Sequence, residues 1–234
     1  MKFRRKKLPA ILFQEEIDKL VAIPNRRYLT GLRNLAILKI MLNCGLRVSE
    51  VVNLRPGDIN LANRVVRIKE GKGGVDRDIS LPENTIQILR EWKEQRPKGD
   101  YFFPVIQSNS RAGSYKTKKG KKEIVVTFNS KRGSRLSTRN IQFMIKNYSK
   151  RAGIKKNIYP HTLRHTFATN FYRQTKDIET LRKLLGHSDI STTQIYVTLA
   201  NIDVEKAMSI HRTRGFLYKL AKLLGIATSL SISS

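Results

Sequence analysis

Two histidine-containing segments and a tyrosine lie close together in the last third of the chain. Leu184–Tyr196 contains the pair Gly186-His187, and Tyr196 follows His187 by nine residues, while His161-Thr-Leu-Arg-His lies shortly upstream. A phenol is a poor nucleophile at neutral pH, because its pKa is about 10. It becomes useful where cations hold an electrophilic phosphate beside it and help to remove its proton. The spacing therefore predicts a phosphate-handling site with a tyrosine nucleophile.

The charge balance of the chain fits a polyanionic substrate. Its 234 residues include 46 Lys and Arg against 18 Asp and Glu, a formal net charge of +28. Such an excess indicates nucleic acid as the partner. A protein that only packs nucleic acid has the same charge, so charge alone leaves an enzyme and a passive binder open. A membrane surface fits less well, because the basic residues are spread along the chain and not confined to one amphipathic face.

The composition indicates a globular protein from a reducing compartment. With 40% hydrophobic residues the chain can bury a core, and the single cysteine, Cys44, excludes an internal disulfide and a thiolate zinc site. The apolar neighbours of Cys44 predict a small buried hydrophobe rather than a reactive thiol. No apolar run reaches the roughly 18 residues of a bilayer span, and the basic start, residues 1–8, lacks the apolar stretch of a secretory signal. We expect a cytoplasmic, nucleoid-associated protein whose basic start is either a DNA-contacting arm or a solvated tail.

Hydrophobic periodicity predicts an α+β fold that is mainly helical. The helices are predicted at residues 14–20, 30–43, 47–54, 83–96, 137–152, 161–174, 178–185, 191–199 and 204–211. Strands at 64–68 and 76–81 flank Gly71-Lys72-Gly73-Gly74, which suits a hairpin turn and presents Lys72 at its tip. A final amphipathic helix within 216–226 packs either on its own domain or on a neighbour.

The stretch Ser108–Arg135 interrupts this pattern with nine Lys or Arg residues against one acid, Glu123. Residues 124–128 within it read as a strand. We expect a basic β-loop over DNA that makes mostly sequence-independent phosphate contacts, a solvated insertion being the alternative. The residues expected to contact DNA are Lys116, Lys118, Lys119, Lys121, Lys122, Lys131, Arg132 and Arg135.

The motifs in order resemble the tyrosine recombinase, or phage integrase, family, and its Xer-type members most of all. The positions that match the family's pattern are Arg47 after Gly-Leu, Lys72 in the hairpin, His161 and Arg164 in His-x-x-Arg, His187 after Gly, and Tyr196. Order and spacing agree over residues 12–212. The resemblance implies a mainly helical tyrosine recombinase catalytic-domain fold with a small antiparallel sheet, and DNA strand exchange as the chemistry.

The resemblance also implies a domain organisation. We expect a basic N-terminal tail at 1–11, the catalytic domain at 12–212 with 108–135 as an insertion, and a C-terminal helix and tail at 213–234. Family members generally carry a separate helical domain that closes around the duplex with the catalytic one. About a dozen residues precede the first predicted helix here, so we expect either an excised catalytic fragment or a minimal enzyme.

Residue chemistry gives each matching position a role. Arg47 and Arg164 present planar guanidinium forks to the non-bridging oxygens of one phosphodiester. Lys72 is the expected general acid for the departing 5′ oxygen, because an ammonium can give up a proton where a guanidinium cannot. His161 either accepts the proton of Tyr196 or positions it through the phosphate.

The remaining roles are a phosphate contact and two supporting ones. His187 is expected to donate a hydrogen bond to a phosphate oxygen. Glu50 is expected to hold a basic residue of the site, and His165 to orient Arg164 or its helix. His161 and His165 are spaced i, i+4 without the glutamate of His-Glu-x-x-His, so we expect no metal.

Attack by Tyr196 yields a 3′-phosphotyrosyl link and a free 5′-hydroxyl. Since bond energy is kept in the link, reversal needs no cofactor, and repetition in a tetramer on synapsed DNA exchanges strands through a Holliday junction, as the resemblance implies. A type IB topoisomerase uses the same kind of residue set to relax DNA without a partner duplex, and a catalytically idle DNA-binding regulator would keep the fold alone. The Xer-like string around Tyr196 favours recombination over relaxation, and the complete set of six residues argues against an idle regulator.

Overall fold

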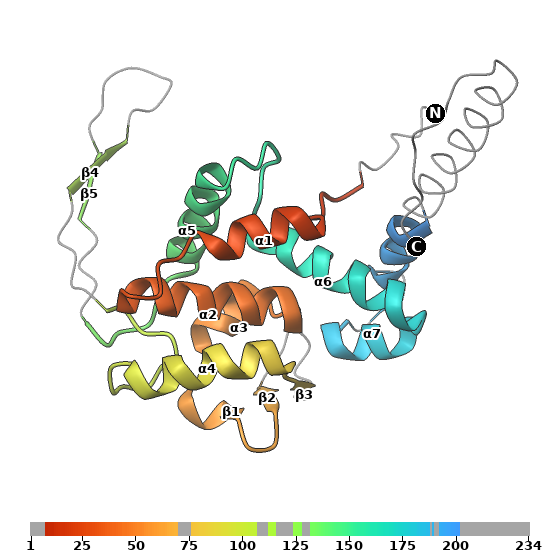
Figure 1. Cartoon of the computed structure of the whole chain (residues 1–234), viewed down its shortest axis with the longest axis horizontal. Helices are drawn as coiled ribbons and strands as arrows, with labels where there is room; N and C mark the ends of the chain where they lie inside the picture. Colours follow the sequence, from red (N-terminus) through yellow and green to blue (C-terminus); the bar gives the residue numbers. More distant parts are fainter. Residues whose placement is uncertain are drawn as a thin grey trace, which may run out of the picture.

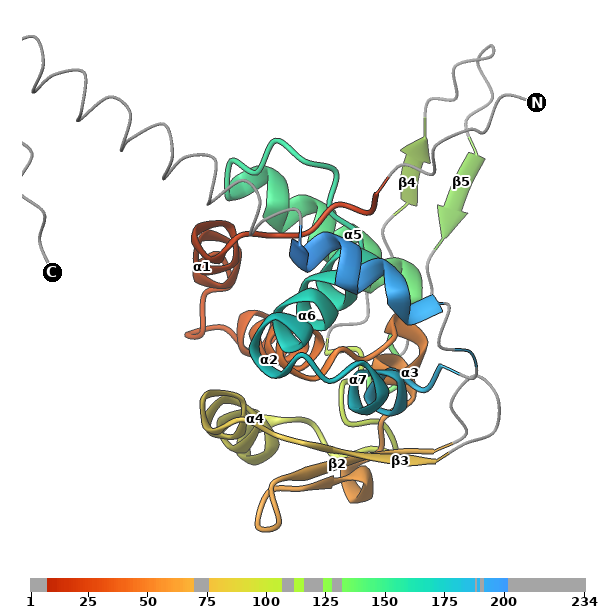
Figure 2. The same ribbon diagram turned by 90° about the vertical axis from the view of Figure 1, so that its right-hand side faces the viewer.

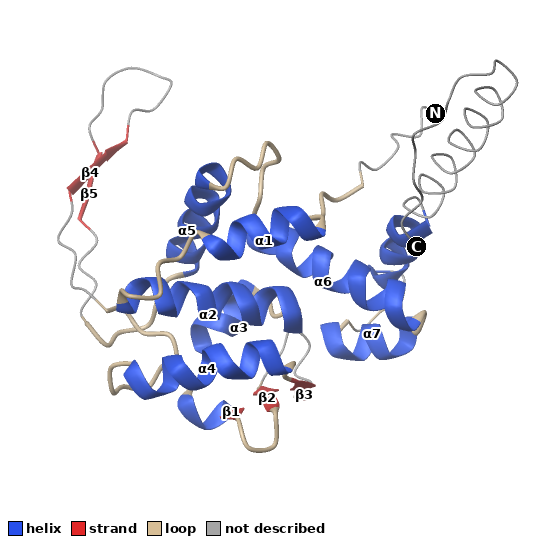
Figure 3. Ribbon diagram, viewed as in Figure 1, coloured by secondary structure: helices blue, strands red, loops and turns tan. Residues whose placement is uncertain are grey.

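The computed structural model describes residues 8–69, 76–106, 112–115, 124–127, 132–187, 189 and 192–201. Helices dominate this part of the chain, with a three-stranded and a two-stranded antiparallel sheet (Figures 1 and 3). The helices are α1 (Gln14–Ala22), α2 (Leu29–Cys44), α3 (Val48–Asn53), α4 (Glu83–Gln95), α5 (Thr138–Arg151), α6 (Pro160–Thr175) and α7 (Ile178–Leu185), with a 3-10 turn at Pro56–Asp58. Residues 192–201 are also helical. The predicted α+β class is confirmed.

The central element is α2, against which α4 and α6 both pack. Leu35 to Leu38 are buried at four successive positions, as a helix surrounded by other elements requires. Cys44 is fully buried at its last turn, and burial raises the pKa of the thiol to about 12, which confirms the interpretation as a small buried hydrophobe. Gly45 then ends the helix in the left-handed conformation, with φ +64°. No helix in the described part of the chain is both long and apolar enough to cross a bilayer.

The predicted hairpin is present as β2 (Val65–Ile68) and β3 (Arg77–Ser80), with Val66 opposite Ile79. Strand β1 (Ile59–Asn60) completes the sheet and was not predicted, because two residues are too few for an alternating pattern. The hairpin turn, with Lys72, lies outside the described residues. In β3 the buried positions alternate, so Arg77 shares the inward face with Ile79.

The basic insertion contains the second sheet. The predicted strand is β5 (Ile124–Thr127), which pairs antiparallel with β4 (Ala112–Tyr115), a strand that sequence patterning missed. Gly113 in β4 weakens the strand signal there. The rest of the insertion up to residue 131 lies outside the described residues.

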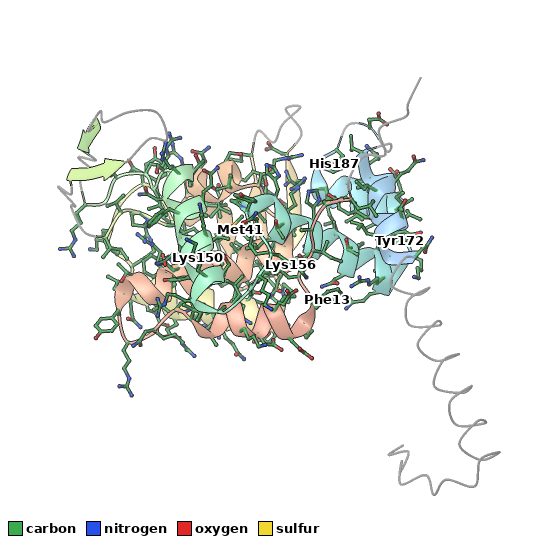
Figure 4. All side chains as sticks on the ribbon, turned by 90° about the horizontal axis from the view of Figure 1, so that it is seen from above. Phe13, Met41, Lys150, Lys156, Tyr172 and His187 are labelled. Atoms are coloured by element: carbon green, nitrogen blue, oxygen red, sulfur yellow. The ribbon has the colours of Figure 1, made fainter. Side chains whose placement is uncertain are left out.

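The segment before α1 joins a second apolar cluster, separate from the main core. Ile11 packs there with Tyr196, which is carried on the helical segment 192–201. Phe13 lies close to Lys156, whose Nζ is 4.2 Å from the ring centroid (Figure 4). The chain that enters α1 therefore contacts the cluster around Tyr196 through Ile11 and the segment between α5 and α6 through Phe13.

Candidate active site

Arg164 projects from α6 into the protein, where only 4% of it is exposed. Its Nη1 donates to the carbonyl of Gly45, at the end of α2, over 2.6 Å, and its Nη2 donates to the carbonyl of Leu185, at the end of α7, over 2.5 Å. Carbonyls at helix C-termini lack helical partners and carry the negative end of the helix dipole. Two helix ends therefore stabilise this buried cation. Burial lowers the pKa of Arg164 to about 10, which still leaves it charged at neutral pH.

Arg47 and Arg77 share the carboxylate of Glu50. Arg47 precedes α3, and both its backbone N–H and its Nη1 donate to Glu50, over 2.7 and 2.9 Å. Nη2 of Arg77 donates to both Glu50 oxygens, at 3.0 and 2.9 Å. The side chains of Arg77 and Glu50 are each 7% exposed, against 16% for Arg47, so Arg47 is the more accessible arginine of the pair.

The C-terminal turn of α7 ties the three arginines together. Three successive carbonyls each accept from a different guanidinium: Leu184 from Arg77 at 2.7 Å, Leu185 from Arg164 at 2.5 Å, and Gly186 from Arg47 at 3.1 Å. Helix α7 packs on β3, which carries Arg77, and Arg47 at the start of α3 reaches the same turn; Figure 2 shows α7 above the β2–β3 hairpin. Gly186 has φ +59°, and a Cβ there would lie 3.1 Å from Nη1 of Arg77.

These side chains concentrate positive charge. Arg47, Arg77 and Arg164 face the one carboxylate of Glu50, so the four groups together carry a net charge of +2. Nη1 of Arg77 is buried and has no hydrogen-bond partner among the described residues. Concentrated, partly buried positive charge is favourable where an anion binds, because desolvated cations are costly unless paired.

His187 extends this cluster, and its hydrogen bonds define its tautomer. Nη2 of Arg164 lies 3.2 Å from Nε2 of His187, and because arginine only donates, Nε2 must be the acceptor. The ring proton is then on Nδ1, which donates to Oγ1 of Thr193 over 3.1 Å. Burial first, and the neighbouring arginines second, lower the pKa of His187 to about 4. The imidazole is therefore neutral at physiological pH.

Tyr196 points its hydroxyl toward the same cluster, although only 2% of the residue is exposed. The hydroxyl lies 3.0 Å from Nδ1 of His165, on α6. Burial raises the pKa of the phenol, while the charges of Arg164 and Arg47 oppose that rise. The nucleophile predicted from the sequence is thus a protonated phenol within the field of two arginines.

The phage integrase family model matches residues 11–203 of the chain. The chain belongs to the phage integrase family. Among the family members similar to it are tyrosine recombinase XerD of Pseudomonas putida, 32% identical over 90% of this chain and 64% of its own length, and tyrosine recombinase XerA of Thermococcus kodakarensis, 32% identical over 86% and 62%. The chain thus spans less than two thirds of the length of these relatives.

Two solved phage integrase family structures agree with this assignment. XerA recombinase superposes with a TM-score of 0.65 at 28% identity, over 88% of this chain and 66% of the other. XerH site-specific recombinase, in a post-cleavage complex with a palindromic difH substrate, superposes with a TM-score of 0.64 at 27% identity, over 88% and 54%. The resemblance to Xer-type recombinases noted from the motifs is confirmed.

The structure brings most of the predicted family residues into one place. Arg47, Arg164, His187 and Tyr196 surround the α7 turn, with the two predicted supporting residues beside them. His161 is exposed on α6, and its ring centroid is 6.4 Å from that of His165. Lys72 lies outside the described residues, so its role remains a prediction.

The structure adds detail to the two supporting roles. Glu50 holds Arg47 and, in addition, Arg77. His165 was expected to orient Arg164 or its helix, whereas its recorded hydrogen bond is to the hydroxyl of Tyr196. Within the described residues, no group of three His, Cys, Asp or Glu side chains is placed to hold a metal ion.

The predicted DNA contacts of the basic insertion fall mostly outside the described residues. The six lysines lie outside that part of the chain, while Arg132 and Arg135 are exposed. Nη1 of Arg135 donates to the side chain of Asn53, at the end of α3, over 2.9 Å. This contact joins the base of the insertion to the helix that follows Arg47.

Sequence reasoning missed Arg77. It lies in the inward phase of a strand, two residues before buried Ile79, where an apolar residue is the usual choice. A charged residue in that phase requires a buried counter-charge. That local signal could have marked Arg77 as part of a polar site, although the sequence does not show that its partner is Glu50.

Proposed function

We propose that the chain provides the catalytic domain of a site-specific DNA recombinase, which cleaves and rejoins strands through a 3′-phosphotyrosyl link at Tyr196. The observation that carries this proposal is the convergence of Arg47, Arg77 and Arg164 on one helix end, beside the hydroxyl of Tyr196. A net charge of +2 suits a phosphodiester, whose negative charge increases in the transition state. Related recombinases bound to DNA support the same substrate.

Arg47 and Arg164 are the groups proposed to bind the non-bridging oxygens. Their charges already act on the phenol, so a phosphate between them and Tyr196 would lie next to the nucleophile. Loss of one such donor costs about 3 kcal/mol of transition-state stabilisation, by analogy with oxyanion-hole donors. Arg47 is the more exposed of the arginines joined by Glu50, and it is the one we expect the phosphate to meet first.

Three other predicted groups complete the proposed site: His187 and His161 are described in the structure, and Lys72 lies outside the described residues. His187 now accepts from Arg164 through Nε2. To donate to a phosphate from that atom it must gain a proton or change tautomer, and a bound anion favours the protonated form. Lys72 is proposed as the general acid that protonates the departing 5′ oxygen, and His161 as a phosphate contact or proton acceptor.

Assembly and location follow from the chemistry as further parts of the proposal. Exchange between two duplexes requires four cleavages, so we propose a tetramer on synapsed DNA, acting on the nucleoid in the cytoplasm. The reaction conserves bond energy in the phosphotyrosyl link, so neither a metal nor a nucleotide cofactor is needed. The remaining lysines of the insertion are proposed to contact DNA phosphates.

The test is covalent capture from a pool of duplexes of random central sequence, each nicked so that cleavage releases a short fragment and traps the protein. Wild type should form an adduct that survives denaturation, and the trapped DNA identifies the site. Tyr196→Phe should abolish the adduct and keep DNA retention on a native gel. Tyr172→Phe, a control on α6, should leave the adduct unchanged. An adduct that persists in Tyr196→Phe would refute the assignment.

The captured DNA site also distinguishes a recombinase from a topoisomerase and from an idle DNA-binding protein. A recombinase needs two duplexes that carry the trapped site, and it joins them into recombinant products. Relaxation of a supercoiled plasmid that lacks the site, at the same rate as one that carries it, would instead indicate a topoisomerase. Absence of any adduct, with DNA still bound, would indicate an idle DNA-binding protein.

A further inference from the structure

His165 holds the hydroxyl of the proposed nucleophile. Its Nδ1 lies 3.0 Å from the hydroxyl oxygen of Tyr196, and the two ring centroids are 5.7 Å apart. His165 follows Arg164 directly on α6, and Arg164 is fixed by the ends of α2 and α7. The imidazole is therefore anchored to the same rigid frame as the arginines. We propose that His165 Nδ1 is the general base that accepts the phenolic proton when Tyr196 attacks DNA.

This inference rests on the proposed function and assigns one step within it. As the phenolic oxygen of Tyr196 bonds to phosphorus, the O–H proton moves to Nδ1 of His165 and the bond from phosphorus to the 5′ oxygen breaks. The 5′ oxygen leaves with that electron pair and takes a proton from a general acid. In the reverse reaction the 5′-hydroxyl attacks phosphorus and returns its proton to the general acid, while the bond from phosphorus to the phenolic oxygen breaks and that oxygen recovers its proton from His165. Atoms and charge balance in both directions.

His165 is neutral before the reaction, as a proton acceptor must be. Burial first, and the charges of His161 and Arg164 second, lower its pKa to about 4. The ring is therefore neutral, and in the tautomer with its proton on Nε2, which the proposal requires, the lone pair of Nδ1 accepts from the phenolic O–H. The groups that face it are His161 and Arg164 on its own helix, Tyr196 on the helical segment 192–201, and His187 after α7.

Relative acidities show when the proton must move. Burial raises the pKa of Tyr196 above the ordinary value of about 10, whereas that of His165 is about 4. Full transfer before attack is therefore strongly disfavoured. A bond to phosphorus makes the phenolic oxygen far more acidic, so transfer becomes favourable as that bond forms. His165 therefore acts within the phosphoryl-transfer step and not before it.

The geometry separates the two histidines of α6. His161 lies one helical turn before His165 and is exposed, where an incoming phosphate can reach it. His165 is half-buried and touches the phenol. His161 was expected either to contact the phosphate or to accept the proton of Tyr196. Its placement fits the phosphate contact better, and we assign acceptance of the phenolic proton to His165.

The experiment measures single-turnover adduct formation on the nicked duplex recovered by capture. His165→Asn places an amide near the position of Nδ1, so it keeps a polar contact with Tyr196 but cannot act as a base. We expect DNA affinity to be unchanged and adduct formation to slow by about 10²- to 10⁴-fold, the usual contribution of a general base. His161→Asn is the matched control on the same helix.

Fluorotyrosine at position 196 distinguishes a general base from a histidine that only supports the structure, because only the loss of a base should be compensated by a more acidic phenol. Its phenol is more acidic, so it depends less on a base. It should restore much of the rate in His165→Asn and little in His161→Asn. Should His165→Asn not fold, His165→Gln replaces it. If neither variant folds, the test uses the wild-type protein with fluorotyrosine at position 196. When His165 takes the proton as the bond to phosphorus forms, the acidity of the phenol should change the rate of adduct formation only slightly.

Three results would overturn the role of His165: a wild-type rate in His165→Asn, a slow rate that fluorotyrosine does not restore, or a large acceleration of wild type by fluorotyrosine. These results leave the proposed function intact as long as wild type forms an adduct through Tyr196. An adduct that survives Tyr196→Phe would instead remove the proposed function, and the role of His165 with it.

Discussion

Replacing Gly186 by alanine should slow DNA cleavage far more than it destabilises the protein. Gly186 has φ +59°, and an added Cβ would lie 3.1 Å from Nη1 of Arg77 and 3.6 Å from Nη1 of Arg47. Arg77 cannot easily move away, because its Nε donates to Leu184 and its Nη2 to Glu50. The methyl group would therefore displace the arginines or the carbonyls that hold them.

Two other glycines with the same backbone conformation calibrate the magnitude. Gly153 has φ +69° and no atom within 4 Å of an added Cβ, so Gly153→Ala should lose only the left-handed backbone term, about 1–2 kcal/mol of unfolding free energy. Gly45 has φ +64°, and its Cβ would lie 2.2 Å from Cδ1 of Phe167. Gly45→Ala should lose a further 1–3 kcal/mol, roughly, from overpacking. Gly186→Ala should fall between the two, because its nearest atom would be 3.1 Å away, against 2.2 Å at Gly45 and none within 4 Å at Gly153.

The rate of DNA cleavage should distinguish Gly186→Ala from Gly153→Ala. Adduct formation on the captured duplex, compared at equal folded fraction, should be near wild type for Gly153→Ala. For Gly186→Ala it should be slower by about 10- to 100-fold, less than the roughly 10²- to 10³-fold cost of losing a whole transition-state contact, because the arginines are displaced and not removed. Urea unfolding followed by circular dichroism gives the stabilities. If Gly186→Ala cleaves DNA as fast as Gly153→Ala, the α7 turn does not determine the positions of Arg47 and Arg77.

Three further predictions concern the charges of the site. Glu50→Gln should lower the unfolding free energy by roughly 3–5 kcal/mol, because it leaves buried guanidiniums uncompensated, and urea titration should show part of that loss restored by duplex DNA. Arg77→Lys should keep DNA affinity on native gels but slow adduct formation about 10-fold, since a lysine lacks the fork that joins Leu184 to Glu50; an unchanged rate would contradict the positioning role. His165 and His187 have pKa values of about 4 when folded, against about 6.5 unfolded, so the unfolded chain binds more protons between those limits and stability falls as pH drops from 6.5 to 4. After allowance for partial solvent screening this amounts to roughly 1–2 kcal/mol per histidine, and urea titrations of a His165→Asn, His187→Asn variant should show a correspondingly smaller acid loss.

The sequence predicted most helices and the β2–β3 hairpin, because both are local. Periodicity fixes which residues of a helix or strand face inward, and Gly45 marks the end of α2 by the same local rule. The strands that the sequence did not predict are short or contain glycine. Strand β1 has two residues and β4 contains Gly113, so neither shows a reliable alternation.

The partners within the site could not be read from the sequence in the same way. Arg77 and Leu184 are 107 residues apart, and Arg164 and Gly45 are 119 apart, so their contacts depend on how α2, α6, α7 and the sheet pack. Motif order brought the right residue types to attention. It did not show that Glu50 joins two arginines or that His165, one turn from the expected His161, contacts the hydroxyl of Tyr196.

The hydrogen bonds of the α7 turn explain why the catalytic groups should respond together to DNA. One turn of backbone accepts from guanidiniums that come from β3, the start of α3 and α6. A phosphate that withdraws Arg164 from Leu185 also removes the donor to Nε2 of His187, and so frees that nitrogen. Because Thr193 holds the other nitrogen of His187, the change reaches the helical segment of Tyr196. We therefore expect phosphate binding at the arginines to be coupled to Tyr196 through His187.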